Sequence, residues 1–440
     1  MITPALSSIA KGWLSLETAD TPMHMGGLLY FRVPKTQSAT AVATALYENW
    51  LEIPPTVAPW TLRLKRSWAN RNQSAWQVDE SLEMEYHLRH AALPRPGGER
   101  ELGELISRLH GRPLDRSRPL WECYLIEGLH GNRFALYLKI HPALISGLDF
   151  LDGVLSGLSQ RPTKQAQPPW TASIALQPKG ALLSDWPHWV KPLWRHLRDA
   201  VSSSLPWAGL QHSPSSALNG RINGLRRFAT QRYSRARLSA LAKQFRVSDE
   251  DILYYAVGSA LRRFFKEYNA LPDEPLVAVV ADRSRQDALL TPLLISLGTH
   301  LCNRRERLQE VRHSLRVARG MVQARPAAAA NAEAAIEVMP YILRQLSRID
   351  HRLPPMFNLG VVNYERPHQR SYLGKAQLEQ VFPMPMLLQG SALAIASISD
   401  PDNIFVGLCG ARDNLPHLQR IAVYMDRALE ELEEEGLDDA

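Results

Sequence analysis

The segment from His141 to Gly147 contains the side chain in this sequence that is best suited to acid–base catalysis. It reads His141-Pro142-Ala143-Leu144-Ile145-Ser146-Gly147 and closes an extended run at residues 133–141. An imidazole titrates near neutral pH and can move a proton, so His141 is a candidate general base, with a tunnel-lining or loop-bracing role as the alternative. Pro142, by contrast, has no proton-accepting side chain and no backbone N–H.

Other groups near this segment are weaker candidates. Ser146 lacks the Gly-x-Ser-x-Gly turn that exposes a nucleophilic serine, so we expect a structural loop serine. Asp149 and Asp152 supply carboxylates a few residues on, and helix capping or surface exposure explains them more simply.

Two further sets of residues could suggest a metal or a reactive thiol. His87 and His90 are three residues apart, but no carboxylate or cysteine completes a site, so we predict no metal and expect fold-stabilising contacts instead. Cys123 lies within an apolar run, which indicates a buried and inert thiol.

Periodicity predicts the elements that position these residues. Alternating or continuous apolar runs predict strands at 26–33, 121–127, 133–141, 276–281, 358–364, 392–399 and 404–409. Helical spacing predicts helices at 101–110, from Ser248 onward with Asp251 as a cap, and at 303–323, 327–348 and 415–432. Strands and helices alternate in both halves, which indicates α/β layers in each. The Pro-rich, polar stretch at 160–220 predicts a linker.

Composition limits the class of protein. The 440 residues suit two or three domains, and the 45% hydrophobic content is enough for a large core. The net charge of +7 fits an anionic surface or ligand and does not by itself indicate nucleic acid, which we do not expect as a partner. Three cysteines far apart predict a reducing compartment, and the absence of a signal peptide or a long apolar run predicts a cytoplasmic protein.

Several blocks together resemble the bacterial wax ester synthase/diacylglycerol acyltransferases along nearly the whole chain. The blocks are Leu16-Glu17-Thr18, Pro22-Met23-His24-Met25-Gly26-Gly27, 86–90, 93–98, Leu114-Asp115-Arg116-Ser117-Arg118-Pro119-Leu120-Trp121-Glu122, 125–128, 260–263, 363–367, 372–374 and 390–393. The resemblance implies two lobes similar to chloramphenicol acetyltransferase, with a tunnel between them for acyl-CoA and an acceptor. It also implies transfer of a fatty acyl group to an alcohol or diacylglycerol, with Trp121, Gly147 and Asn363 at the tunnel or the motif loop.

The same resemblance exposes a departure at the catalytic motif. The family carries His-His-x-x-x-Asp-Gly directly after the strand at 133–141, with the second histidine as general base and the aspartate holding the loop. Here Pro142 and Ser146 stand at those two positions, while His141 and Gly147 remain. Loss of a general base costs about a hundred- to ten-thousandfold in rate. A smaller departure is Glu250-Asp251, where the family has Asn-Asp at a helix start.

A tryptophan-rich segment suggests a membrane surface. Trp186, Trp189 and Trp194 accompany basic residues at helical spacing between 186 and 201, which is typical of an interfacial helix. The alternative is a crossover helix that packs these tryptophans on protein, shortened by Pro187 and Pro192.

We therefore expect an α/β fold with an N-terminal lobe at 1–160, a linker or crossover at 161–220 and a C-terminal lobe at 221–440. The favoured function is a non-catalytic or very weakly active binding or regulatory member of the family, which takes acyl-CoA or neutral lipid and has no covalently bound cofactor. The alternative is a working O-acyltransferase that uses His141 or an unusual acceptor. A third hypothesis is a partner of an active paralogue, peripheral on the inner membrane or on lipid droplets.

Overall fold

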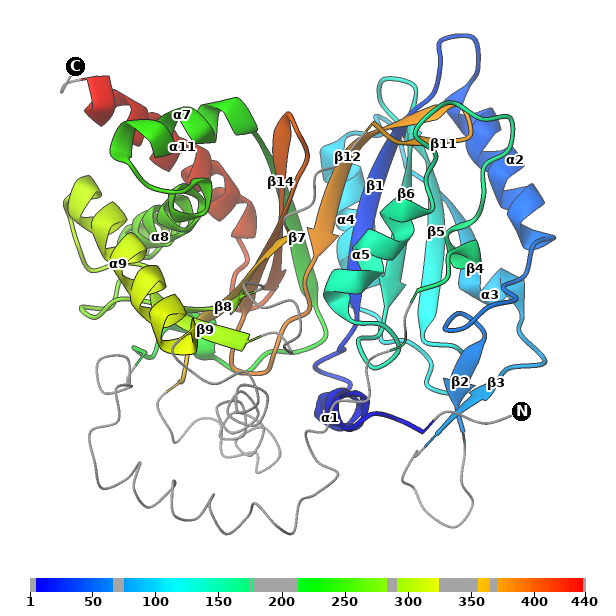
Figure 1. The fold of residues 1–440 in the computed structure, drawn as a ribbon, viewed down its shortest axis with the longest axis horizontal. Coiled ribbons are helices and arrows are strands. Elements are labelled where there is room, and N and C mark those ends of the chain that lie inside the picture. Colours follow the sequence, from blue (N-terminus) through cyan, green and yellow to red (C-terminus); the bar gives the residue numbers. More distant parts are fainter. Residues whose placement is uncertain are drawn as a thin grey trace.

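The computed structural model describes residues 5–65, 75–174, 176, 213–282, 291–323, 355–364 and 370–437. Within these ranges the chain forms two six-stranded sheets that stand next to each other, each with its own helices (Figure 1). A small hairpin of β2 (Leu62–Leu64) and β3 (Trp76–Val78) extends from the first lobe. The predicted α/β fold with two lobes is confirmed.

The first sheet has the strand order β11-β12-β1-β6-β5-β4. Its strands are β1 (Met25–Arg32), β4 (Leu88–Ala92), β5 (Trp121–Leu129), β6 (Arg133–Ile140), β11 (Tyr372–Leu373) and β12 (Ala376–Met384). The pair β4 and β5 is parallel, and the other pairs are antiparallel. The lobe's helices are α1 (Ser8–Leu16), α2 (Ala39–Leu51), α3 (Met84–His87), α4 (Glu99–His110) and α5 (Gly147–Ser156).

Helices α4 and α5 cover opposite faces of the first sheet. A Cβ atom on Gly27 of β1 would clash with Leu151 of α5, so that face is in close contact with α5. On the other face, the Tyr137 hydroxyl of β6 lies 2.9 Å from His110 Nδ1 at the end of α4. Side chains alternate between the two faces along a strand. Because helices cover both faces, the residues of β6 that point to either face are buried.

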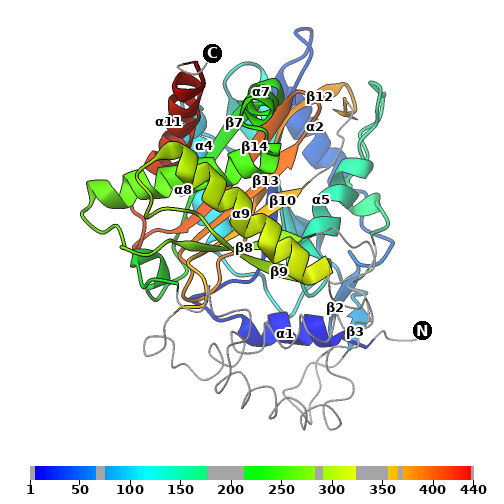
Figure 2. The same ribbon diagram turned by 60° about the vertical axis from the view of Figure 1, so that its left-hand side comes forward.

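The second sheet has the order β7-β14-β13-β10-β8-β9. Its strands are β7 (Arg226–Ser234), β8 (Val277–Asp282), β9 (Thr291–Ser296), β10 (Leu359–Tyr364), β13 (Leu393–Ser399) and β14 (Asn403–Ala411). Its helices are α7 (Arg235–Phe245), α8 (Asp249–Glu267), α9 (Arg304–Gln323) and α11 (Leu418–Leu437). These four helices lie together on the outer side of the sheet, away from the first lobe (Figures 1 and 2).

The chain crosses between the lobes late in the sequence. Strands β11 and β12 belong to the first sheet, where β12 pairs with β1, although they lie between β10 and β13 of the second. The range 221–440 expected for the second lobe therefore contains two strands of the first sheet. The two sheets meet where a Cβ on Gly407 of β14 would lie 2.0 Å from the Pro383 carbonyl oxygen of β12. Only glycine allows that approach.

The strands predicted at 26–33, 121–127, 133–141, 276–281, 358–364, 392–399 and 404–409 are all present within a few residues, as are the helices at 101–110, 303–323 and 415–432. The cap at the start of α8 is confirmed, because the Asp251 N–H donates to Ser248 Oγ and the Ser248 N–H donates to Asp251 Oδ2. The helix predicted at 327–348 lies outside the described residues.

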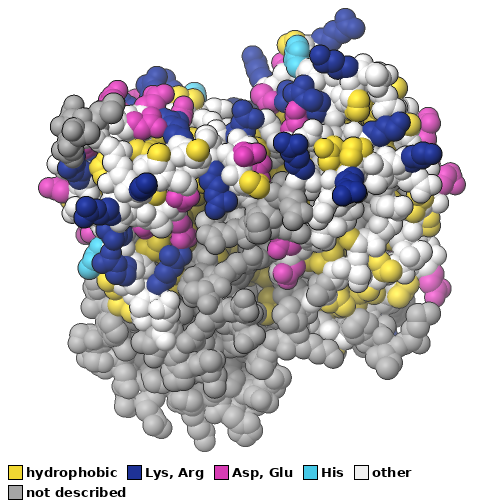
Figure 3. Space-filling view, turned by 45° about the horizontal axis from the view of Figure 1, so that its top comes forward, with side chains coloured by type: hydrophobic (Ala, Val, Ile, Leu, Met, Phe, Trp, Pro, Cys, Tyr) yellow, Lys and Arg dark blue, Asp and Glu magenta, His cyan; other side chains and the backbone are white. Residues whose placement is uncertain are grey.

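The described ends of the predicted 161–220 linker pack on the lobes. Trp170 is fully buried and its Nε1–H donates to the Ile53 carbonyl, and Leu218 is fully buried in the second lobe. No helix in the described ranges combines the length and the apolar character that crossing a membrane requires. Basic side chains are spread over both lobes on the face in Figure 3, interspersed with acidic and hydrophobic ones.

Candidate active site in the loop after β6

The segment at 141–147 forms a buried loop at the junction of the two lobes. β6 ends at Ile140 and α5 begins at Gly147, with residues 141–145 buried between them. The Tyr364 hydroxyl, at the end of β10 in the second lobe, lies 3.4 Å from the Gly147 carbonyl oxygen. A Cβ on Gly147 would lie 2.3 Å from Met25 Sδ, so Gly147 packs directly against a side chain of β1. The loop is thus held against both lobes.

His141 is turned into the protein and is not accessible from solvent. Its side chain is 0% exposed, and its Nδ1 accepts a 3.0 Å hydrogen bond from the Ala143 N–H. Because Nδ1 accepts, the neutral ring carries its proton on Nε2. Nε2 lies 3.8 Å from Glu17 Oε2, which is longer than a hydrogen bond. The imidazole therefore has no free lone pair to offer a substrate.

The surroundings of His141 also keep the ring neutral. Burial lowers the pKa of His141 to about 3, and the positive charge of Arg116 acts in the same direction. Arg116 is held in place by a 2.8 Å ion pair with Glu17, and Glu17 also accepts from the Met23 N–H. Two of the blocks that carry the family resemblance therefore converge behind the loop.

Positions 142 and 146 serve backbone structure. Pro142 is buried in the loop. Ser146 is the N-cap of α5, where its Oγ accepts from the Asp149 N–H and donates to Asp149 Oδ2 at 2.6 Å. Asp149 is exposed and has its carboxylate directed to this cap. Ser146 thus satisfies a free N–H of the first helical turn, a role worth about 1 kcal/mol.

The three residues expected at the tunnel or motif loop have different surroundings. Gly147 lies at the junction described above. Trp121 is 1% exposed, donates from Nε1 to the Trp60 carbonyl and stacks on His87 with ring centroids 4.4 Å apart. Asn363 neighbours Tyr364 on β10, and its Oδ1 accepts from Ser397 Oγ at 2.9 Å. Trp186, Trp189 and Trp194 lie outside the described residues.

The alternative metal and thiol roles do not match the contacts. His87 Nδ1 lies 2.8 Å from the Trp121 carbonyl, whereas His90 stacks on Tyr47 and lies 3.4 Å from Glu127. In the described parts of the chain, no three His, Cys, Asp or Glu side chains are grouped to hold a metal ion. Cys123 is fully buried, and burial raises the pKa of its thiol.

A buried polar cluster behind the sheet was not predicted. His24 Nε2 donates to the His110 carbonyl, and His110 Nδ1 accepts from the Tyr137 hydroxyl. Burial lowers the pKa of His110 to about 3 and that of His24 well below its usual range. His24 Nδ1 has no hydrogen-bond partner among the described residues, and His24 is 1% exposed. We refer to His24, His87, His110 and His141 as the buried histidines.

A buried ion pair adjoins this cluster. Lys139 Nζ lies 3.1 Å from Glu122 Oε2, with both side chains at least 94% buried, and also donates to the carbonyls of Leu109 and Arg112 at the end of α4. The Tyr124 hydroxyl donates to Glu122. Alternation along β6 placed Lys139 and His141 on one face, but no sequence signal showed that α4 would cover that face.

Comparison with known proteins identifies the family. Residues 6–253 match the wax ester synthase/diacylglycerol acyltransferase catalytic domain, and residues 290–433 match the C-terminal domain of the same family. The chain is 30% identical to the O-acyltransferase WSD of Acinetobacter baylyi, over 95% of this chain and 94% of that protein. It is 32% identical to a Mycobacterium tuberculosis protein named provisionally as a diacylglycerol O-acyltransferase, over 97% and 99% of the two chains.

Solved structures give the same answer for the fold. The wax ester synthase/diacylglycerol acyltransferase of Marinobacter aquaeolei superposes with a TM-score of 0.84 at 29% identity, covering 98% of this chain and 99% of that one. A starter condensation domain of rhizomide synthetase, solved with C8-CoA and Leu-SNAC, superposes with a TM-score of 0.53 at 12% identity over 99% and 94% of the two chains, which indicates a shared fold alone. This chain belongs to the wax ester synthase/diacylglycerol acyltransferase family.

Proposed function

We propose that this chain is a member of its family that binds acyl-CoA or neutral lipid without turning it over. The proposal rests on the absence of a usable base in the loop at 141–147. Proline stands where the resemblance places the catalytic histidine, and the remaining imidazole is committed to the loop itself through the Ala143 N–H. A base must reach within about 2.6–3.2 Å of the proton that it removes and must have a free lone pair.

The geometry argues against the alternative in which His141 acts as the base. His141 would have to break its bond to the Ala143 N–H, exchange its ring proton and rotate out of a fully buried position. Its lowered pKa also makes it a poor proton acceptor, because the imidazolium form is disfavoured by burial. The loss of His and Asp at positions 142 and 146 thus has no replacement in the loop.

His24 is the second histidine that could be considered as a substitute base. Its Nδ1 lone pair lacks a hydrogen-bond partner among the described residues. However, His24 is almost fully buried, and its position beneath α4 leaves it without access to a substrate hydroxyl. We assign it to the packing between β1 and α4.

Multiple-turnover assays test the proposal. Purified protein is incubated with palmitoyl-CoA and either hexadecanol or diacylglycerol, and the release of free coenzyme A thiol is followed. We expect a rate at least a hundredfold below that of a relative with the intact His-His-x-x-x-Asp-Gly motif, the lower end of what a lost base costs. A rate equal to that of the relative would overturn the proposal, and His141→Asn and His24→Gln variants would then identify the base.

Restoring the motif is the complementary experiment. The double variant Pro142→His/Ser146→Asp reinstates both family residues, and Asp at 146 can still cap α5. We expect thiol release to appear in the double variant and not in Ser146→Asp alone, which serves as the matched control. Equal activity in the two variants would show that the loss of the imidazole is not what limits turnover.

Attachment to a membrane or to an active paralogue remains a separate prediction. It depends on Trp186, Trp189 and Trp194, for which the described residues supply no contacts. The proposal of binding without turnover does not depend on it.

A further inference from the structure

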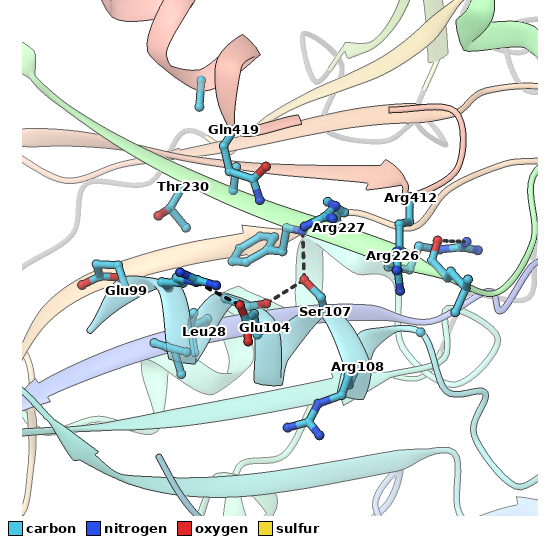
Figure 4. A pocket seen from close by; sticks show the side chains of 18 of the residues that line it. Leu28, Glu99, Glu104, Ser107, Arg108, Arg226, Arg227, Thr230, Arg412 and Gln419 are labelled. Atoms are coloured by element: carbon cyan, nitrogen blue, oxygen red, sulfur yellow. Dashed lines mark hydrogen bonds and ion pairs between the residues drawn. The ribbon is translucent and has the colours of Figure 1, made fainter. Parts of the chain in front are cut away.

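A large groove runs between the two lobes along β7, which is an edge strand of the second sheet. Its volume is about 1470 Å³, larger than the roughly 300–1,000 Å³ of ordinary ligand pockets. Helix α4 forms one wall and the start of α11 forms the other, with β7 between them (Figure 4). We call this the β7 groove, and its size suits a segment of another polypeptide better than a small molecule.

Only one edge of β7 is paired with another strand. That edge pairs with β14 in antiparallel register, and in such a pair every second residue points its N–H and C=O groups away from the partner strand. Phe228 is one of these residues, because its N–H donates to Ser107 Oγ of α4 at 3.1 Å. Thr230 and Arg232 follow at the same spacing, and among the described residues their outward N–H and C=O groups have no hydrogen-bond partner. The outer edge of β7 therefore has free main-chain donors and acceptors beyond Phe228.

Helix α4 covers this edge at Phe228 and leaves it open at Thr230. Ser107 and Gly103 lie one turn apart on the same face of α4, and Ser107 Oγ donates to the Gly103 carbonyl at 2.6 Å. Both residues line the groove, but a Cβ atom placed on Gly103 would meet no other atom within 4 Å. Thr230 lies further along β7, toward Glu99 at the start of α4 (Figure 4). The unpaired part of the β7 edge therefore faces open space, and free strand edges of this kind accept an added strand.

Positive charge dominates the lining of the β7 groove. Glu104 is one of its two lining carboxylates and pairs with Arg100 at 3.1 Å. Glu99 is the other and accepts from the Tyr30 hydroxyl at 2.7 Å. Arg227 Nε is buried and has no hydrogen-bond partner among the described residues, which is unusual for a buried donor. The lining arginines are Arg100, Arg108, Arg112, Arg226, Arg227 and Arg412. An occupant with carboxylates complements this charge.

The wall formed by α11 adds an apolar contact beside the same edge. Val423 lines the groove and is 47% exposed, which is high for a large apolar side chain. It lies next to Ala422, whose carbonyl accepts from Gln231 Nε2 of β7 at 2.8 Å, so it flanks the open part of the strand. An extended polypeptide directs alternate side chains to opposite sides, so it can place carboxylates on one side and apolar groups on the other. A nucleic acid has no main-chain amide groups to pair with the strand edge.

The charge of β7 argues against a second copy of this chain as the occupant. Pairing of β7 with its own equivalent would bring Arg227 and Arg232 of two molecules together on one sheet. Like charges on neighbouring strands are destabilising. A partner of opposite charge is therefore favoured over self-association.

We propose that the free edge of β7 binds an extended, acidic segment of a partner protein, which adds to the six-stranded second sheet as a further strand. The segment pairs its main chain with Thr230 and Arg232, passes over Gly103, and directs carboxylates to Arg227 and apolar side chains to Val423. This goes beyond the proposed function, because it assigns a surface for a protein partner rather than for acyl-CoA or neutral lipid.

Fluorescence anisotropy with the full chain and labelled synthetic peptides tests the proposal. The probe is a short peptide in which glutamate alternates with valine, and we expect saturable binding of one peptide per chain that weakens as salt rises. The same peptide with lysine in place of glutamate should not bind. Two further peptides carry N-methyl groups, one on the valine amides and one on the glutamate amides. At least one of them should bind about tenfold more weakly or worse, because it loses the N–H groups that face β7.

Two pairs of variants locate the binding site. Gly103→Leu fills the open space beside the strand edge without a clash at Cβ, and leucine is a better helix former than glycine, so the fold should be kept. It should weaken binding of the glutamate peptide by about tenfold or more, and Arg227→Gln should do the same through loss of one charge-assisted contact. The controls are Gly320→Leu and Arg316→Gln, at exposed positions of α9 away from the groove, where Gly320 also has open space around its Cβ position. Both controls should bind the peptide as the parent chain does.

Several results would overturn the proposal. They are the absence of saturable binding, equal binding of the lysine peptide, full binding by both N-methylated peptides, and equal loss of binding in the groove variants and their controls. A dimer in sedimentation velocity that Gly103→Leu dissociates would assign the edge to a second copy instead. The peptide carries no acyl chain or thioester, so its failure to bind would remove this inference and leave the assays with palmitoyl-CoA unaffected.

Discussion

Replacing His141 with alanine should lower the free energy of unfolding, because this ring braces the loop at 141–147. The variant removes the acceptor for the Ala143 N–H in a position that is 0% exposed. An unsatisfied buried donor costs about 1–3 kcal/mol, and the lost packing of the ring brings the total to about 2–4 kcal/mol. For a lobe of about 200 residues this corresponds to a fall of about 4–16 °C in the thermal midpoint.

A second substitution separates the hydrogen bond from the packing. In His141→Asn the side-chain carbonyl can still accept from the Ala143 N–H, so we expect about half the loss of His141→Ala. His313→Ala is the control, because His313 is exposed on α9, and its midpoint should stay within about 0.5 kcal/mol of the parent protein.

The assay is thermal unfolding followed by circular dichroism at pH 7.5. An unchanged midpoint in His141→Ala would refute the bracing role of this ring. Equal destabilisation by alanine and asparagine would refute the hydrogen bond to Ala143 as its cause.

Three further predictions concern the buried Lys139–Glu122 ion pair, the buried histidines and the tryptophan-rich segment. Glu122→Gln leaves Lys139 as an unpaired buried charge and should lower the free energy of unfolding, measured in urea, by about 3–5 kcal/mol. The control Glu104→Gln, at the exposed ion pair with Arg100, should lower it by no more than about 1 kcal/mol. Similar losses in the two variants would contradict the argument from burial. The buried histidines have pKa values below 6.5 in the folded chain, so the unfolded chain binds more protons than the folded chain as the pH falls. The free energy of unfolding should therefore drop by about 1.4 kcal/mol per histidine for each pH unit below 6.5. A urea midpoint that is higher at pH 5 than at pH 6.5 would contradict this prediction. If the tryptophan segment is interfacial, serine at Trp186, Trp189 and Trp194 should abolish flotation with anionic liposomes, and unchanged flotation would remove that role.

Local sequence patterns predicted most of the elements because their signals are short-range. The strand at 133–141 and the cap at Ser248 each depend on a few adjacent residues, and each is present. The burial of this face could not be predicted in the same way, because the groups that cover it are distant in the sequence. Lys139 donates to the Leu109 and Arg112 carbonyls, and the fully buried His141 lies near Glu17.

Contacts between residues far apart in the sequence could not be predicted from local patterns. The pairing of β12 with β1 joins residues about 350 positions apart, and no local pattern in 372–384 distinguishes the first sheet from the second. Arg226 and Arg412 are likewise far apart in the sequence and become neighbours only when β7 pairs with β14. In contrast, Pro142 was visible directly in the sequence, at the position where the resemblance places the family's catalytic histidine.

The residues around the loop that carry the family resemblance have a structural role of their own. Glu17 and Arg116 pair at 2.8 Å behind His141, and Glu17 also holds the Met23 N–H at the start of β1. These contacts fix the loop to the sheet. Neither contact involves the side chain at position 142 or 146.

A single-turnover measurement tests the absence of a base most directly. With protein in excess over palmitoyl-CoA and with hexadecanol present, binding and product release no longer limit the signal, so thiol release reports the chemical step alone. We predict release no faster than in the absence of protein, and faster release in Pro142→His/Ser146→Asp. Stoichiometric formation of palmityl palmitate by the unaltered chain would contradict the account.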